Sequence, residues 1–457
     1  MGGNNHDKAE VIQSMMFVSS ISTLLQTLVG TRLPVGASHT FVIPMKTIVL
    51  SMSLLCIDQP QPPEKTFANT MARMQGALLV ASVIQIILGF SGLWRLFVRS
   101  LSPLSMVPLI TFTGLGLFSF GFPRVILCPS HLIHESLRYR NTYKIMFIWR
   151  IMSKFIFSTV QFCVLMDNYL FSWQIVVNIC IWHLQFKTLL LSINYAMFWV
   201  FFGQQYVSTF LKTNRQIFDR YAIIFSTAII WVYALILTLS GVYNNKPPAT
   251  QLSCRTDRAG LIHEADWVYL PRPFQWGKPI VNLREATPII FAGLVALVES
   301  TGTFIAAARY ASATPVPPSV ISRGTFWLGI GTLLNGVCGA VTGPTASVES
   351  AGLLGLTRVG SRRVIQISTG FMLIFSIFGK LAAFFASVPY PIMAATYCIL
   401  YAYVSSAGLN HLQFCNLNSF RTLFILGFAF FMAISVPQHF RDYLPTSNSS
   451  PICFGVF

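Results

Sequence analysis

The sequence predicts an all-α membrane protein that crosses the bilayer many times. Of its 457 residues, 54% are hydrophobic and only 10% are charged, a composition far too apolar for a soluble protein of this length. Apolar runs recur along the chain, and their length is close to the roughly 20 residues that a membrane-spanning helix requires. Two shorter segments, 33–44 and 341–352, are interrupted by glycine and proline near opposite ends of the chain. Such a pair is typical of proteins built from inverted repeats, with both broken segments near the midplane.

The apolar runs follow one another in a regular order. The predicted spans are 9–30, 71–89, 101–122, 221–243, 286–308, 327–340, 364–387, 389–406 and 422–436. Residues 31–46 form a proline-bounded piece that is too short to cross the membrane as a helix. Arg95 and Arg99 indicate a loop between two spans. Several runs are rich in Gly, Ala and Ser, as closely packed membrane helices are.

Basic residues occupy the short connections and set the predicted orientation. They are Arg32, Arg95, Arg99, Lys212, Arg215, Arg220, Arg309, Arg323, Arg358, Arg362, Arg363 and Arg421. If all face the cytoplasm, the alternation of crossings is self-consistent and the polar connection 244–284 is an extracellular loop. The same count places Met1 outside, a position that a missing first helix would explain. Because the net charge of +17 is not gathered in a basic tract, nucleic-acid binding is not expected.

The region 130–203 is harder to interpret than the rest of the chain. It is apolar, yet it carries charged residues without Gly or Pro at recognisable boundaries. It must cross an odd number of times to join an outside Pro123 to an inside Lys212. One crossing and three crossings both satisfy that condition.

Two carboxylates lie inside well-formed apolar runs. Glu299 follows V-A-L-V, and Glu349 follows the Gly-Pro break in T-G-P-T-A-S-V-E-S. An ionisable group at membrane depth is expensive unless it is paired, so the two predict a polar functional site. A structural carboxylate paired with a lysine such as Lys380 is the alternative. His39 lies in the first broken segment. Two roles fit it equally well, a packed or hydrogen-bonded side chain and a proton carrier.

Other chemistry has little support. The sequence shows no nucleophile, base and orienter triad and no Gly-rich phosphate loop. Its 9 cysteines are scattered without a C-x-x-C pair or a histidine at metal spacing, so neither a zinc site nor a disulfide framework is indicated. We therefore expect no enzymatic activity, no metal and no cofactor.

Several longer stretches carry a family pattern. They are G-T-R-L-P with V-G-A-S-x-T-F (30–41), Q-G-A-L-L-V-A-S with L-G-F-S-G-L-W-R (75–95), S-C-R-T-D-R-A-G-L-I (253–262), A-L-V-E-S-T-G (296–302), R-Y-A-S-A-T (309–314), S-x-E-x-A-G-L-L-G-L-T-R-V-G-S-R-R-V (347–364) and L-Q-F-C-N-L-N-S-F-R-T (412–422). With these motifs the chain resembles the nucleobase-ascorbate transporter family, most closely its plant branch. The resemblance covers roughly 9–128 and 204–440.

The resemblance implies a fold and a site. The fold is one of inverted seven-helix repeats, split into a core domain and a gate domain and usually dimeric through the gate. Substrates of such proteins are xanthine, uric acid, adenine or uracil, driven by protons, and some animal relatives carry ascorbate with sodium. By motif position, the expected substrate-binding residues are Glu299, Glu349, Ser350, His39, Ala351 and Gly352. Thr357 and Arg358 complete the signature.

The sequence also departs from that family. Ser350 stands where the signature has Asn, His39 replaces an aromatic residue, and Thr303 replaces a protonatable group of some relatives. The family's first helix and its last span are expected to be missing. The chain is therefore expected to form one transporter domain, 1–457. Its parts are a first-repeat part (9–128), an atypical and possibly non-family segment (130–203), a gate-type span (204–243), an extracellular loop (244–284) and a second-repeat part (285–440).

Three functions stay open on this basis. The first is a proton-coupled nucleobase symporter that works by alternating access as a homodimer in the plasma membrane, in contact with membrane lipid. The second is a non-transporting partner that regulates an intact relative. The third is an ascorbate or other anion carrier of the same fold, against which the two carboxylates argue, because they would repel an anion unless protonated.

Overall fold

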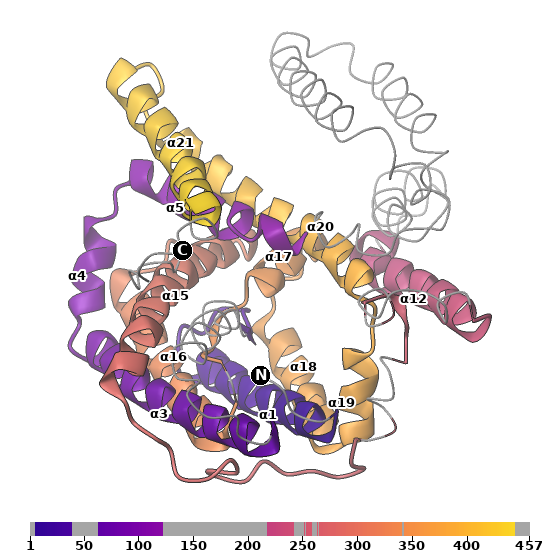
Figure 1. Ribbon diagram of the computed structural model, residues 1–457. Helices are drawn as coiled ribbons and strands as arrows, with labels where there is room; N and C mark the ends of the chain where they lie inside the picture. The colour runs from indigo at the N-terminus through magenta and orange to yellow at the C-terminus, as the bar shows by residue number, and fades with distance from the viewer. Residues whose placement is uncertain are drawn as a thin grey trace.

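The computed structural model describes residues 5–38, 63–121, 217–241, 251, 253–257, 263, 265–340 and 342–443 (Figure 1). The helices in this part of the chain are α1 (Asn5–Leu28), α3 (Pro63–Phe90), α4 (Leu93–Ser100), α5 (Pro103–Leu115), α12 (Ile217–Leu239), α15 (Leu283–Tyr310), α16 (Pro318–Cys338), α17 (Val348–Thr357), α18 (Arg362–Ile377), α19 (Gly379–Ala386), α20 (Tyr390–Asn410) and α21 (Phe420–Tyr443). Two short strands, β1 (Ala37–Ser38) and β2 (Thr345–Ala346), and short 3-10 turns at Phe118–Phe120 and His411–Phe414 complete it.

The predicted class is confirmed by the length and composition of these helices. Five of them, within α1, α3, α15, α20 and α21, are long and apolar enough to cross a membrane, and the number rises to 7 if each bent helix pair is one span. The protein is therefore an all-α polytopic membrane protein. The atypical segment 130–203 and the last residues of the chain lie outside the described residues.

The helices are arranged around α15 and α17. Figure 1 shows α1, α3 and α16 packed together on one side, α5, α20 and α21 on the other, and α12 beside α20. The largest hydrophobic cluster joins α15, α16, α17 and α20 and includes Val35 and Ala346 from the two interrupted segments. The middle of the packed interior is therefore where the regular helices are broken.

Glycines allow the close approach of several helices. A side chain at Gly408 of α20 would come within 2.4 Å of the Thr111 backbone of α5, and one at Gly329 of α16 would come within 2.8 Å of the Ile86 backbone of α3. Neither distance leaves room for a Cβ atom. The expectation from the Gly-rich and Ala-rich runs, that small residues bring membrane helices together, matches these contacts.

The predicted loop at Arg95 and Arg99 is wrong, because these residues lie in helix α4. Trp94 and Val98 are four residues apart on one face of the helix and are buried, whereas both arginines are exposed. The charges suggested a connection, but a single turn-to-turn apolar pair is enough to hold a short helix against the bundle. The helix makes a 106° bend with α5.

The predicted single span 364–387 is bent by 112° between α18 and α19. At the break, the connection before α15 supplies hydrogen bonds: the Tyr269 N–H donates to the Ile377 carbonyl (2.9 Å) and the Gly379 N–H donates to the Trp267 carbonyl (3.2 Å). A side chain at Gly379 would overlap the Gln13 amide of α1. The bend depends on a distant segment of chain, so a local apolar pattern could not reveal it.

Candidate substrate-binding site

The two interrupted segments meet in the interior. Strands β1 and β2 pair in antiparallel fashion, with Ala37 opposite Ala346 and Ser38 opposite Thr345. The Ser347 N–H adds a hydrogen bond to the Gly36 carbonyl (2.8 Å). Backbone groups that leave a helix at membrane depth need protein partners, because lipid offers none. The β1–β2 pair, which we call the strand crossing, or simply the crossing, supplies these partners by joining two segments far apart in the sequence.

Hydroxyl groups from neighbouring helices satisfy the remaining backbone groups of the crossing. From α1, Ser19 donates to the Ala37 carbonyl (2.8 Å) and Thr23 accepts from the Ala37 N–H (2.9 Å). From α15, Ser300 accepts from the Ala346 N–H (3.0 Å). These hydroxyls fix the position of both strands between α1 and α15. Ser300 immediately follows Glu299, so the bond also fixes the turn that carries this carboxylate.

Glu349 lies in the first turn of the half-helix α17, directly after the crossing. Ser347 is the N-cap: its hydroxyl accepts from the Ser350 N–H (3.0 Å) and donates to one Glu349 oxygen, Oε2 (2.9 Å). The other oxygen, Oε1, accepts from the Tyr401 hydroxyl of α20 (2.9 Å). The positive end of the helix dipole also favours a negative charge in this turn. Both oxygens of the carboxylate are therefore oriented before any ligand binds.

Glu299 lies on α15, facing the same region. It is half-buried, and the next residue, Ser300, bonds to β2, which directly precedes α17. The structure thus brings the turns that carry Glu299 and Glu349, separated along the chain, to the same strand. Helix α15 is held in register by buried bonds: the Trp94 indole donates to Thr301 (3.1 Å), and Gln85 donates to the Gly293 carbonyl (3.3 Å).

The other predicted site residues divide into two groups. Ser350 faces the crossing, because a Cβ placed on Gly36 would lie 3.2 Å from the Ser350 hydroxyl oxygen. Ala351 is fully buried, and Gly352 touches α20 so closely that a side chain there would come within 2.3 Å of the Leu400 carbonyl oxygen. Both residues lie in the packed interior, and their predicted contact with substrate stays a prediction. His39 lies outside the described residues.

Thr357 and Arg358 end the half-helix and lie away from Glu349. The Thr357 hydroxyl donates to the Leu353 carbonyl (2.8 Å). Arg358 is exposed, has a left-handed backbone (φ 56°) and donates its N–H to the Leu354 carbonyl (2.9 Å). The signature therefore encodes a complete capped half-helix, with its charged end at Glu349 and its C-cap at Arg358.

Sequence reasoning missed Tyr401 and the capping role of Ser347. Tyr401 lies in a run that was interpreted only as a span, and its ring stacks on Tyr397 one turn earlier (5.3 Å between centroids, 10° between planes). Two tyrosines four residues apart within an apolar helix were the available signal, because a buried phenol needs a hydrogen-bond partner. The S-x-E spacing was the corresponding signal for Ser347.

The alternative partner for the carboxylates, Lys380, is placed elsewhere. Its ammonium group donates to the His263 carbonyl (2.8 Å) and lies 5.8 Å from the centroid of the Trp267 ring. Lys380 therefore binds the connection that precedes α15. The motif at 253–262 also belongs to this connection: Cys254 is disulfide-bonded, which the scattered cysteines did not predict, and Arg255 donates two hydrogen bonds to Asp257 (2.9 and 2.6 Å).

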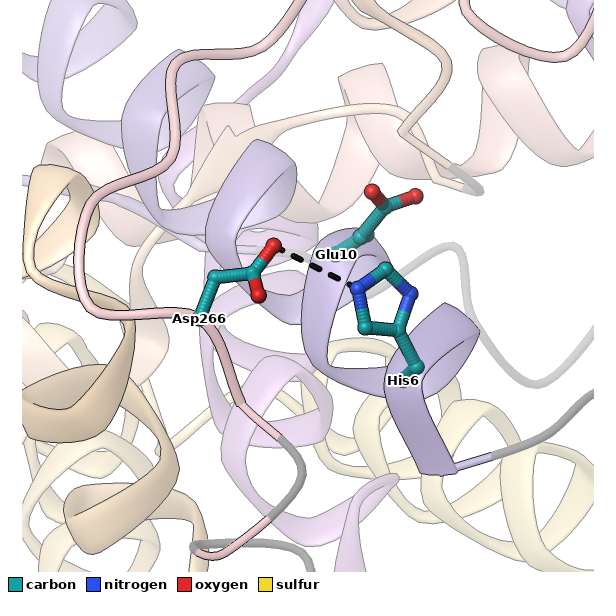
Figure 2. Close-up of side chains that lie close together, drawn as sticks. All are labelled: His6, Glu10 and Asp266. Carbon is teal, nitrogen blue, oxygen red and sulfur yellow. Dashed lines mark hydrogen bonds and ion pairs between the residues drawn. The ribbon is translucent and has the colours of Figure 1, made fainter.

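A further group of titratable side chains joins α1 to the same connection. Figure 2 shows His6 and Glu10, on successive turns of α1, facing Asp266. The His6 Nε2 and Asp266 Oδ2 atoms are 3.3 Å apart, and one ligand atom from each of the three residues lies within 4.8 Å of the others. The His6 and Asp266 side chains are 48% and 54% exposed. Exposed ion pairs contribute about 0–1 kcal/mol to folding stability. We therefore interpret the group as a weak surface contact between α1 and the connection.

Comparison with known proteins places this geometry in a family context. A model described as the Permease family matches residues 1–189 and 164–442, stretches that run through the segment 130–203. The chain is 46% identical over 457 residues to nucleobase-ascorbate transporter 6 of Arabidopsis thaliana, covering 100% of this chain and 74% of the relative. It is 47% identical over 457 residues to nucleobase-ascorbate transporter 5 of the same plant, with the same coverage. Nucleobase-ascorbate transporter LPE1 of Zea mays is 44% identical over 446 residues, covering 97% and 72%.

Proposed function

Because this chain belongs to the permease family, we propose that it is a secondary transporter of nucleobases of the xanthine, uric acid, adenine or uracil class. Protons drive the transport, and the protein exposes its site to the two sides of the membrane in alternation. It acts in the plasma membrane as a homodimer.

The observation that carries the proposal is that two side chains orient the Glu349 carboxylate at the start of α17. Each of its oxygens accepts a hydrogen bond, Oε2 from Ser347 and Oε1 from Tyr401. A carboxylate offers about four lone-pair positions, so it keeps capacity for a ligand donor. A nucleobase presents ring N–H donors beside carbonyl acceptors. Glu349 is suited to the former as a charge-assisted acceptor.

The packing of α15 against α17, which carry Glu299 and Glu349, supports proton coupling. Two carboxylates at one binding site repel each other while both are ionised. Binding of a proton relieves that repulsion, so a proton and a neutral base stabilise the site together. A bound ascorbate anion would add a third negative charge, and for this reason we prefer a nucleobase over ascorbate as substrate.

The test is uptake of radiolabelled xanthine, uric acid, adenine and uracil by cells that lack their own carriers. We expect uptake of at least one base, stimulated by an inward proton gradient and abolished by a protonophore. Glu349→Gln should abolish it, whereas Glu10→Gln, the same chemical change in the surface group of Figure 2, should leave it unchanged. Uptake of ascorbate but of none of the four bases would overturn the proposal.

A second function follows from Ser350. A serine at the crossing offers a single hydroxyl, whereas an asparagine would offer two N–H donors and a separate carbonyl acceptor at a greater reach. A chain weakened in this way would serve as a regulatory partner of an active relative. Co-purification with a full-length relative, by a chain that shows no uptake alone, distinguishes this function from transport.

A further inference from the structure

A polar pocket lies where α3 ends and α16 begins, at the opposite end of α3 from its first turn. Its volume is about 260 Å³. The lining residues are Gly89, Phe90, Gly92, Arg95, Ser319, Ser322, Arg323 and Phe326. They come from α3, α4 and α16, which pack against one another (Figure 1). None of them belongs to the site at Glu299 and Glu349.

The pocket is held open by specific backbone contacts. Ser322 of α16 donates to the Gly89 carbonyl of α3 (2.9 Å), and a side chain at Gly89 would come within 2.4 Å of the Phe326 backbone. Gly92 has a left-handed backbone (φ 77°), which turns the chain from α3 into α4. A Cβ at Gly92 would lie 2.7 Å from the guanidinium of Arg95. The turn therefore positions this arginine over the pocket.

The described residues that line the pocket supply two positive charges, Arg95 and Arg323, and no carboxylate. Arg323 donates from Nε to the Gly30 carbonyl at the end of α1 (2.8 Å), which anchors its guanidinium. Among the described residues, the ion pairs involve neither Arg95 nor Arg323. Ser319 adds a hydroxyl at the rim. Two guanidinium groups and the Ser319 hydroxyl in one pocket suit a phosphate group, to which arginine can bind in bidentate fashion.

An apolar surface leads from the pocket along the outside of the bundle. Val83, Ile87 and Phe90 lie at helical spacing on one face of α3 and are 51%, 54% and 82% exposed. Leu93 and Leu96 of α4 are also exposed beside it. The apolar helix that forms this face ends at Phe90, so the pocket lies at the depth of lipid headgroups. A ligand with a phosphate at one end and hydrocarbon at the other matches both features.

We propose that this pocket binds the phosphate headgroup of an anionic phospholipid, with Arg95 and Arg323 as its ligands and the Val83–Phe90 face of α3 in contact with an acyl chain. The arginine-rich end of the bundle is the end that the positive-inside rule assigns to the cytoplasm. Anionic lipids are concentrated in that leaflet. The headgroup would join the ends of α1, α3 and α16, which frame one side of the central crossing.

The experiment measures lipid retained by the purified full-length chain in native mass spectrometry, using phosphatidylserine and phosphatidylcholine with identical acyl chains. We expect preferential retention of phosphatidylserine, and Arg95→Gln should lower its apparent affinity about 10-fold, the effect of losing one hydrogen bond to a charged phosphate. Arg95 is exposed, so its replacement leaves the buried residues of α4, Trp94 and Val98, in place. Arg99→Gln, on the same helix but outside the pocket, is the matched control and should bind normally.

Three outcomes would overturn the proposal. They are equal retention of the two lipids, equal binding by Arg95→Gln and the wild type, and equal losses in Arg95→Gln and Arg99→Gln. A further arm tests the source of the phosphate: inorganic phosphate should not displace phosphatidylserine at millimolar concentration. Displacement would assign the pocket to a free anion instead. Arg323→Lys, which retains a charge but not the guanidinium fork, should give an intermediate affinity.

Discussion

Tyr401→Phe removes one hydroxyl from the site and leaves the ring. The lost bond is the one donated to Glu349 Oε1 at 2.9 Å. Hydrogen bonds to charged groups contribute about 1.5–3 kcal/mol, which corresponds to roughly 10- to 150-fold in an equilibrium constant. Ser347 still holds Oε2 in the variant, so we expect the lower end of that range. The KM for nucleobase uptake should rise about 10-fold, because the carboxylate can rotate away from the ligand position.

The assay is concentration-dependent uptake, combined with the amount of protein at the cell surface and its thermal stability in detergent. Tyr310→Phe is the matched control, since it also removes a tyrosine hydroxyl bonded to α20, at Tyr403 and Ser406, but far from Glu349. It should leave the KM unchanged. A KM for Tyr401→Phe within twofold of the wild type, or an equal rise in Tyr310→Phe, would refute the orienting role of Tyr401.

Four other substitutions test the site and its packing. Glu299→Gln should abolish uptake at normal surface expression, and retained uptake would remove Glu299 from the substrate site. Ser350→Asn should increase uptake, because the amide restores a second hydrogen-bonding group beside Gly36. An unchanged rate would place any weakness of the chain elsewhere. Gly352→Ala should lower the thermal stability by about 1–3 kcal/mol through overpacking against Leu400. Gly370→Ala in α18, where a Cβ meets nothing within 4 Å, should be neutral or stabilising.

Much of the central region could be predicted from sequence, because its signals are local. The Gly-Pro break and the charge of Glu349 stand out within an apolar run. The S-x-E spacing at Ser347 was also a local signal for the start of α17, although it was not used. What the sequence does not encode locally is which segments meet. The pairing of Ala37 with Ala346, and the bond from Tyr401 to Glu349, depend on tertiary packing.

The errors have the same origin. Arg95 and Arg99 indicated a loop because charged residues between two apolar runs usually mark a connection. The segment is a helix instead, because Trp94 is buried against the bundle. The bend before Gly379 has no proline to mark it. It depends on hydrogen bonds from Tyr269, about 110 residues earlier in the chain. A pattern within one run contains no information about such a partner.

The crossing of β1 and β2 makes the site intolerant of changes in chain length. Successive residues of a strand point to opposite faces, so a one-residue slip would exchange the faces of Ser38 and Thr345. An insertion between Ala346 and Val348 would also rotate Glu349 by about 100° around the α17 axis. Substitutions can therefore accumulate around this crossing, but insertions and deletions cannot. The spacing from Gly36 to Ser38 and from Thr345 to Glu349 is as much a part of the binding site as the carboxylates themselves.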